Sequence, residues 1–205
     1  MYKIFKRTFD IVSAGLLLLI ISPLFAVLAI MVRVNLGSPV FFCQIRSGKN
    51  QKPFKLIKFR TMTNEKDSDG NLLPNEQRFT KFGCRLRSSS LDELPELINI
   101  IKGDMSVIGP RPLPPYYDDY YRERELKRFS VRGGLVSPES VDKDPFISWD
   151  KQLAYDVKYA EEISFKTDCV ILYKVFRMLF YRYEGNLGGW NRQALNIERK
   201  NVKSL

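Results

Sequence analysis

Two adjacent carboxylates, Asp92 and Glu93, lie between Arg87 and Arg111 and are the side chains in this chain most suited to chemistry. The chain contains no histidine. Proton transfer, nucleophilic attack and metal binding must therefore rely on carboxylates, lysines, tyrosines or the three cysteines. The acidic pair is accordingly the first candidate for a catalytic centre.

The same pair also fits a structural role at the start of a helix. Apolar residues at helical spacing predict a helix over residues 91–102 with one buried face. Ser90 and Glu93 match a capping box, in which both side chains satisfy the first helical amides. Pro95 is comfortable only in a first helical turn, so Asp92 or Glu93 could be the cap instead. The spacing alone leaves capping and chemistry open.

Basic residues that could bind phosphate lie on both sides of the pair. Lys58 and Arg60 belong to a segment over residues 54–62 that alternates only partly, which indicates a short strand or an extended loop. Arg111 lies between two prolines, and a restricted backbone lowers the ordering loss when a guanidinium grips a phosphate. The alternatives are a solvated face and a plain connector with an exposed arginine.

The polar loop over residues 64–77 contains two patterns that imitate metal sites. Asp67-Ser68-Asp69 resembles the DxD motif with which many glycosyltransferases hold a metal-bound nucleotide. The loop also partly follows the spacing of a calcium-binding loop, but it begins with Glu65 and contains Pro74. Such stretches are ordinarily turns, and we interpret this one as a turn.

Composition predicts a folded protein with one sizeable domain, alone or with an appendage. Hydrophobic residues make up 44% of the 205 residues, which argues against disorder. The three cysteines, Cys43, Cys84 and Cys169, are scattered and have no CxxC spacing. They predict reduced thiols in a cytosolic compartment, without a disulfide framework or a zinc site.

Positive charge is concentrated at the beginning of the chain. Residues 1–60 contain ten basic residues and a single acid, Asp10, whereas the rest of the chain is nearly neutral. This excess surrounds an apolar run and suits an anionic membrane surface or a phosphate-bearing ligand. Nucleic acid is not an expected partner, because no recognition motif accompanies the basic residues.

The apolar run over residues 11–32 carries no charge and would extend about 33 Å as a helix, enough to cross a bilayer core of about 30 Å. Ser22 and Pro23 interrupt it. Proline removes a backbone hydrogen bond and bends a helix, and serine can partly satisfy the freed carbonyls. Because basic residues flank both ends, the positive-inside rule favours a hairpin that enters and leaves on one side. A kinked spanning helix is the alternative.

Three later segments have helical character. Residues 116–128 and 150–163 are predicted to be surface helices with mixed charge. Residues 169–183 are more apolar, and their basic and aromatic side chains fit either the membrane interface or a buried core.

Taken together, these residues resemble the bacterial sugar transferase family, the small monotopic phosphoglycosyl transferases. The resemblance covers most of residues 1–180. Its most specific part is the Leu-Asp-Glu-Leu-Pro motif at residues 91–95, followed by Gly-Asp-Met-Ser and Gly-Pro-Arg-Pro, behind an apolar run broken by Ser-Pro. The matching segments are residues 5–10, 22–23, 58–62, 87, 90–95, 97–106, 108–112, 148–149 and 155–156.

The resemblance implies an α-rich α+β fold. A re-entrant membrane helix hairpin, broken at Ser22-Pro23, would be anchored in the inner leaflet of the bacterial inner membrane. A compact catalytic domain with interfacial amphipathic helices would lie on the cytoplasmic face. The chain is then divided into the re-entrant helix with its basic flank (1–36), the catalytic domain (37–185) and a polar C-terminal tail (186–205).

The resemblance also implies an enzyme that moves a phosphosugar from a UDP-sugar to polyprenyl (undecaprenyl) phosphate and releases UMP, as the first membrane step of glycan assembly. By the matching positions, Asp92 is the nucleophile that forms an aspartyl-phosphosugar intermediate, and Glu93 with Asp92 holds Mg²⁺. The candidates for binding substrate phosphates are Lys58, Arg60, Arg87 and Arg111. Downstream glycosyltransferases could be further partners. The chemistry is consistent, since Mg²⁺ and arginines offset the repulsion between a carboxylate and an anionic diphosphate.

Residues 132–138 depart from the family, which usually has Arg-Pro-Gly-Ile/Leu-Thr-Gly after the tyrosine-rich segment. Gly133 and Gly134 are expected to loosen a turn that proline would stiffen, so the donor could be unusual or the activity reduced. Two alternatives therefore remain. One is a non-catalytic membrane-surface scaffold for glycan enzymes, and the other is a glycosyltransferase that uses Asp67-Ser68-Asp69 and releases UDP.

Overall fold

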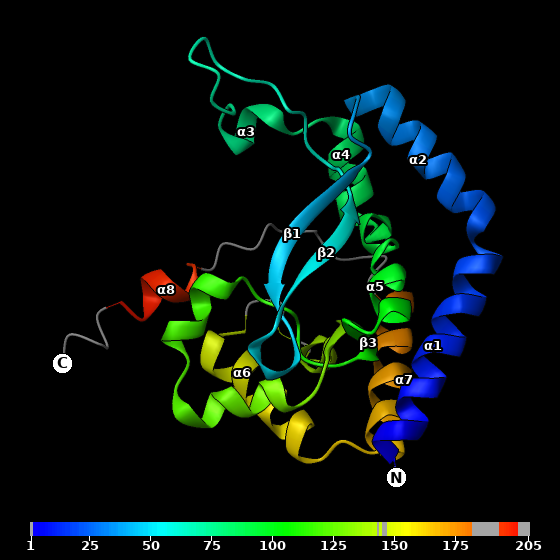
Figure 1. Ribbon diagram of the computed structural model, residues 1–205, viewed down its shortest axis with the longest axis vertical. Coiled ribbons are helices and arrows are strands. Elements are labelled where there is room, and N and C mark those ends of the chain that lie inside the picture. Colours follow the sequence, from blue (N-terminus) through cyan, green and yellow to red (C-terminus); the bar gives the residue numbers. More distant parts are fainter. Residues whose placement is uncertain (1, 143, 145–146, 182–192, 201–205) are drawn as a thin grey trace.

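A long, bent helix pair runs along one side of the molecule, and the rest of the described chain lies on its inner side (Figure 1). The computed structural model describes residues 2–142, 144, 147–181 and 193–200. Within these residues the fold is rich in helices and has two small sheets of two strands each.

The bend lies between α1 (Tyr2–Ile20) and α2 (Ser22–Leu36), whose axes differ by 67°. Pro23 has no N–H to donate to the Leu19 carbonyl, and the Ser22 hydroxyl donates to that oxygen instead, at 2.8 Å. No single described helix has the length and hydropathy of a membrane span, but α1 and α2 pass that test together as a bent pair.

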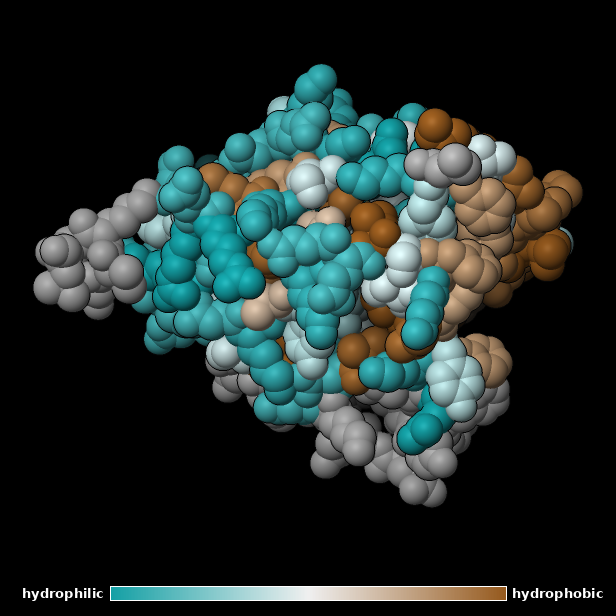
Figure 2. Space-filling view, turned by 90° about the horizontal axis from the view of Figure 1, so that it is seen from below, coloured by the Kyte–Doolittle hydropathy of each residue, from teal (hydrophilic) through white to brown (hydrophobic). Residues whose placement is uncertain are grey.

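Apolar side chains are exposed along the outside of this pair. Ile4, Leu19, Ile20 and Val34 are between 72% and 78% exposed. Figure 2 shows hydrophobic atoms gathered on one side of the molecule and hydrophilic atoms on the other. A surface of this extent ordinarily contacts a partner or a membrane.

The inner face of α1 is fixed to α5 (Glu96–Lys102) and β3 (Met105–Ile108). Ala14 is fully buried in a cluster with apolar residues of β2, α5 and β3. Arg7 donates to the Ile100 and Ile101 carbonyls at 2.7 and 3.1 Å, and the buried Asp10 accepts from the Ser106 hydroxyl at 2.6 Å. The helix pair therefore shares its core with the rest of the chain.

The first sheet links α2 to the centre of the molecule. Its strands, β1 (Phe41–Ser47) and β2 (Pro53–Phe59), are antiparallel and joined by η1 (Lys49–Gln51). Phe59 packs with the buried face of α2 and with Leu86. The segment over residues 54–62 is thus a strand for most of its length.

The second sheet pairs β3 in parallel with β4 (Gly133–Val136). The expectation of a loosened turn at the two glycines is wrong. A Cβ on Gly133 would lie 2.6 Å from the Pro112 ring, and one on Gly134 would lie 2.0 Å from the Gly109 nitrogen. Close backbone approach thus excludes larger residues here.

The remaining elements surround these sheets. Residues 116–128, predicted to be a surface helix, fall in two short 3₁₀ helices with a break between them, and residues 150–163 are mostly α-helical, as predicted. The elements are α3 (Asn75–Arg78), α4 (Lys81–Ser88), η2 (Leu91–Glu93), η3 (Pro115–Tyr120), η4 (Glu123–Ser130), η5 (Pro138–Val141), α6 (Trp149–Glu161), α7 (Phe165–Tyr181) and α8 (Leu195–Glu198).

The last two helices bear on the predictions for the C-terminal part. On α7, Ile171 is buried, whereas Tyr173 and Phe176 are 65% and 62% exposed, so one side packs on the core and another does not. The predicted tail (186–205) lies partly outside the described residues. Its described part is docked, because Leu195 is fully buried and Arg199 pairs with Glu125 at 2.6 Å.

Candidate active site

The carboxylate pair lies in the single 3₁₀ turn η2, between α4 and α5. Ser90 has a left-handed backbone (φ 57°), and its side chain makes no capping hydrogen bond. The following α-helix begins only at Glu96, after Pro95. The capping-box interpretation is therefore wrong. The side chains of Asp92 and Glu93 do not cap the following helix either.

Glu93 is the centre of an ion-pair cluster drawn from three segments. Its Oε1 accepts from the Lys58 ammonium of β2 at 2.6 Å and from the Arg111 guanidinium, beyond β3, at 3.2 Å. Burial acts to raise the pKa of Glu93, but the charges of Arg111 and Lys58 outweigh it and lower this pKa overall. Glu93 is thus held ionised.

Asp92 has a different environment, although it is the next residue. It is 7% exposed, and no side chain in the described ranges donates a hydrogen bond to it. Burial raises the pKa of Asp92 to about 6, while the charges of Lys58 and Arg87 act in the opposite direction. The result is a buried carboxylate that no described side chain engages by a hydrogen bond, beside a cationic cluster.

The structure adds a third carboxylate that sequence reasoning missed. Glu96 is 4% exposed, and its Oε1 lies 3.1 Å from the Lys58 ammonium. Burial raises the pKa of Glu96 to about 7 despite the nearby Lys58. Its spacing four residues after Asp92 was a usable signal, since such residues share one face of a helical turn.

Arg87 precedes the acidic pair in the sequence and Arg111 follows it, and both side chains lie near the cluster. Arg87, in the last turn of α4, lies near enough to lower the pKa of Asp92, and its guanidinium carbon is 5.9 Å from the Phe79 ring centroid. Arg111 has a half-exposed side chain and a backbone carbonyl that accepts from Arg128 at 2.7 Å. Both guanidinium groups remain partly open to solvent, as phosphate binding requires.

Arg60 does not join the cluster. Its side chain is buried and donates to the Ser38 carbonyl at 3.0 Å and to the Leu36 carbonyl. These bonds fasten the end of α2 to the residues after β2, and the contact of Arg60 with substrate stays a prediction. Arg60 lies one residue beyond the end of β2, where the Leu36 and Ser38 carbonyls accept its hydrogen bonds.

The Asp67 carboxylate is occupied within its own loop. Its Oδ1 accepts from the backbone nitrogens of Asp69 and Asn71 at 3.0 and 2.8 Å, which closes a turn around Gly70. This geometry agrees with the interpretation of residues 64–77 as a turn-containing loop.

The predicted Mg²⁺ site would draw its protein ligands from the two carboxylates of η2. The described residues contain no group of three or more histidine, cysteine or acidic side chains arranged to hold a metal. Mg²⁺ commonly takes only one or two carboxylates and completes its shell with water and substrate phosphates. Asp92 and Glu93 supply that number of carboxylates.

Comparison with known proteins gives consistent matches. The family model described as "Bacterial sugar transferase" matches residues 1–182. The uncharacterised sugar transferase EpsL of Bacillus subtilis strain 168 is 46% identical over 169 residues, covering 82% of this chain and 84% of the relative. The exopolysaccharide production protein ExoY of Rhizobium meliloti strain 1021 is 34% identical, with 82% of both chains covered.

A third relative has a more specific name but a longer chain. It is the UDP-glucose:undecaprenyl-phosphate glucose-1-phosphate transferase of Klebsiella pneumoniae, 36% identical over 180 residues. The match covers 83% of this chain and 39% of that protein.

Proposed function

Because the chain belongs to the bacterial sugar transferase family, we propose that it transfers a sugar phosphate from a UDP-sugar to polyprenyl phosphate and releases UMP. The Klebsiella pneumoniae relative, whose name states such a transfer, supports this proposal. The observation that carries it is the buried Asp92 carboxylate, which no described side chain engages by a hydrogen bond, beside a cluster of cations.

In the first half-reaction, an Asp92 oxygen attacks the phosphorus that bears the sugar. The bond between this phosphorus and the oxygen bridging to the uridine phosphate breaks, and UMP leaves with the electron pair. The product on the protein is an aspartyl-phosphosugar. In the second half-reaction, an oxygen of polyprenyl phosphate attacks the same phosphorus, the Asp92–phosphorus bond breaks, and the carboxylate is restored.

The cations around Asp92 have the charge that this chemistry needs. Lys58, Arg87 and Arg111 offset the negative charge of the diphosphate as the anionic nucleophile approaches it. Glu93 keeps Lys58 and Arg111 in place by its ion pairs. Mg²⁺ held by Asp92 and Glu93 would add neutralisation of the phosphate oxygens.

We further propose that the bent pair α1–α2 is a re-entrant hairpin in the cytoplasmic leaflet of a bacterial plasma membrane. The exposed apolar residues of both helices and the basic residues at both ends support this orientation. The lipid acceptor would then meet η2 at the level of the headgroups.

The test is product analysis. Purified protein in detergent, with Mg²⁺ and polyprenyl phosphate, is incubated with a panel of UDP-hexoses and UDP-N-acetylhexosamines. UMP release with at least one donor is expected. Release of UDP would indicate direct glycosyl transfer, and binding without any nucleotide product would favour the scaffold alternative.

Two matched variants locate the chemistry. Asp92→Asn should reduce turnover to background, because an amide is a poor nucleophile toward phosphorus. Asp69→Asn, which removes a carboxylate from the polar loop, should leave turnover unchanged. Mass spectrometry of protein incubated with donor alone should find the phosphosugar on Asp92, and an adduct elsewhere would contradict the assignment.

A further inference from the structure

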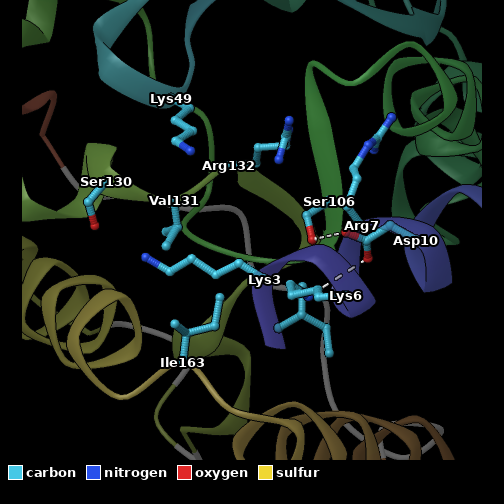
Figure 3. A pocket seen from close by; sticks show the side chains of 11 residues that line it. Lys3, Lys6, Arg7, Asp10, Lys49, Ser106, Ser130, Val131, Arg132 and Ile163 are labelled. Carbon is cyan, nitrogen blue, oxygen red and sulfur yellow. Dashed lines mark hydrogen bonds and ion pairs between the residues drawn. The ribbon is translucent and has the colours of Figure 1, made fainter. Parts of the chain in front are cut away.

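A hollow of about 50 Å³ lies between the start of α1, η1 and the segment that leads into β4 (Figure 3). Five of its lining side chains are cationic, and only one, Asp10, is acidic. None of its lining residues belongs to the cluster around Asp92. The hollow is therefore a separate concentration of positive charge.

Two of these cations have structural tasks. Lys6 lies 2.8 Å from Asp168 and 3.7 Å from Asp10, so its charge is balanced locally. Arg7 donates to backbone carbonyls at the end of α5. Both fasten α1 to the rest of the chain.

The other three cations have no acidic partner within the described ranges. Lys3 and Lys49 are exposed, and Arg132 uses only its Nε, which donates to the Gly103 carbonyl at 2.8 Å. In Figure 3 the Lys3 side chain extends across the hollow, and the Lys49 ammonium points into the same space from the opposite side, with the Ser130 hydroxyl nearby. Three cationic side chains without an acidic partner in the described ranges, from separate segments, thus line the same hollow.

The size and setting of the hollow indicate the class of ligand. Its volume accommodates about four water-sized groups, which is comparable to the four oxygens of a phosphate. The first turn of α1, which contributes Lys3 to the hollow, also carries the exposed apolar side chains of Ile4 and Phe5. A cationic hollow at the rim of an apolar surface suits a phosphate carried by a lipid.

We propose that this hollow binds the phosphate group of an anionic lipid, through Lys3, Lys49 and Arg132. The exposed side chains of Lys3 and Lys49 can adjust to the phosphate, whereas Arg132 is held in place by its hydrogen bond to the Gly103 carbonyl. The site would hold the start of α1 at the headgroup layer, independently of the transfer reaction proposed for Asp92.

The experiment compares two double variants that remove the same charge. Lys3→Gln/Lys49→Gln changes the hollow, whereas Lys52→Gln/Lys158→Gln changes exposed lysines outside it. All four lysines are exposed, so both proteins should fold. The detergent-solubilised full chain is titrated with phosphatidylglycerol and, separately, with phosphatidylcholine, and retained lipid is counted by native mass spectrometry. A calorimetric titration uses inorganic phosphate.

The unmodified protein should prefer phosphatidylglycerol to phosphatidylcholine. The hollow variant should bind phosphatidylglycerol about tenfold to thirtyfold more weakly, and the control variant should bind it as the parent does. If inorganic phosphate binds with the same dependence on Lys3 and Lys49, a phosphate group alone suffices; if it does not bind, the lipid chains are needed. Equal losses in both variants, or no loss in the hollow variant, would overturn the proposal.

Discussion

Asp92 is placed where its charged form is costly to the fold. Burial raises its pKa from 3.8 to about 6, so the folded protein holds this proton more tightly than the unfolded chain does. The unfolded chain then loses the proton first as the pH rises. The free energy of unfolding therefore falls between about pH 4 and pH 6 and stays lower above that range.

Asp92→Asn should consequently stabilise the protein at neutral pH while it abolishes turnover. The gain is about 2–3 kcal/mol at most, since one pKa unit corresponds to about 1.4 kcal/mol. The measurement is the midpoint of thermal unfolding in detergent without added Mg²⁺. Glu93→Gln is the control of opposite sign, because it leaves Lys58 and Arg111 without their shared partner. A destabilised Asp92→Asn protein would contradict this account of burial.

Glu96 should make the free energy of unfolding depend on pH over a range that extends above the range set by Asp92. Its pKa is raised by burial from 4.5 to about 7, so stability should fall as the pH rises between these values. In Glu96→Gln this fall should be smaller, because the amide does not titrate. Thermal unfolding followed from pH 4 to pH 8 tests this, with Glu123→Gln on an exposed turn as the control. Identical slopes for Glu96→Gln and the parent would contradict it.

Sequence reasoning identified part of this site and missed part. Lys58, Arg87 and Arg111 were predicted near the acidic pair because all three belong to the motifs that carry the resemblance. The structure places them there. Glu96 was not predicted as a site residue, because an acidic residue is common in the first turn of a helix. Strand alternation would place Lys58 and Arg60 on the same face, so it could not reveal that Arg60, just beyond β2, bonds to the carbonyls of Leu36 and Ser38 instead.

At the scale of elements, Arg60 acts as a clamp between α2 and the first sheet. Arg60→Lys keeps the charge but loses the fork that bonds two carbonyls, so it should destabilise the protein by about 2–4 kcal/mol. The KM for the UDP-sugar in the folded enzyme should not change. Arg33→Lys, at an exposed position on α2, should have no effect on either quantity. A raised KM at unchanged stability would restore Arg60 as a substrate ligand.

The elements also show why some local expectations were wrong. Gly133 and Gly134 were expected to loosen the chain, yet they allow β4 to approach Gly109 and Pro112. That reason lies more than twenty positions away in the sequence, where local analysis does not reach. In contrast, the break at Ser22-Pro23 was predictable, since proline acts on its own helix.

At the scale of the whole molecule, the helix pair belongs to the same core as the site. Asp10 accepts from the backbone nitrogen of Val107 at 3.1 Å, just after Ser106, and α5 runs from the site to the Arg7 contacts. The orientation of α1 therefore determines where Asp92 lies relative to the apolar surface. A change in the bend between α1 and α2 is therefore expected to move Asp92 relative to the apolar surface, and so to change activity.

Replacing both residues at the bend, Ser22→Ala and Pro23→Ala, should favour a continuous helix. Residue 23 regains an N–H for the Leu19 carbonyl, and an uninterrupted helix over residues 2–36 would extend about 50 Å, enough to cross a bilayer. The N-terminus should then move to the outer side in part of the population. An impermeant thiol reagent applied to spheroplasts reports this, with Ile4→Cys as the reporter and the three native cysteines replaced by serine.

The unaltered bend should keep this cysteine protected, and Ser13→Ala is the matched control, because the Ser13 hydroxyl also bonds to a carbonyl within α1. UMP release should fall in proportion to the labelled fraction, since a spanning α1 cannot keep its Arg7 and Asp10 contacts. Labelling of the protein that retains Ser22 and Pro23 would contradict the re-entrant hairpin. Labelling of the straightened variant at full activity would instead show that the hairpin does not position Asp92.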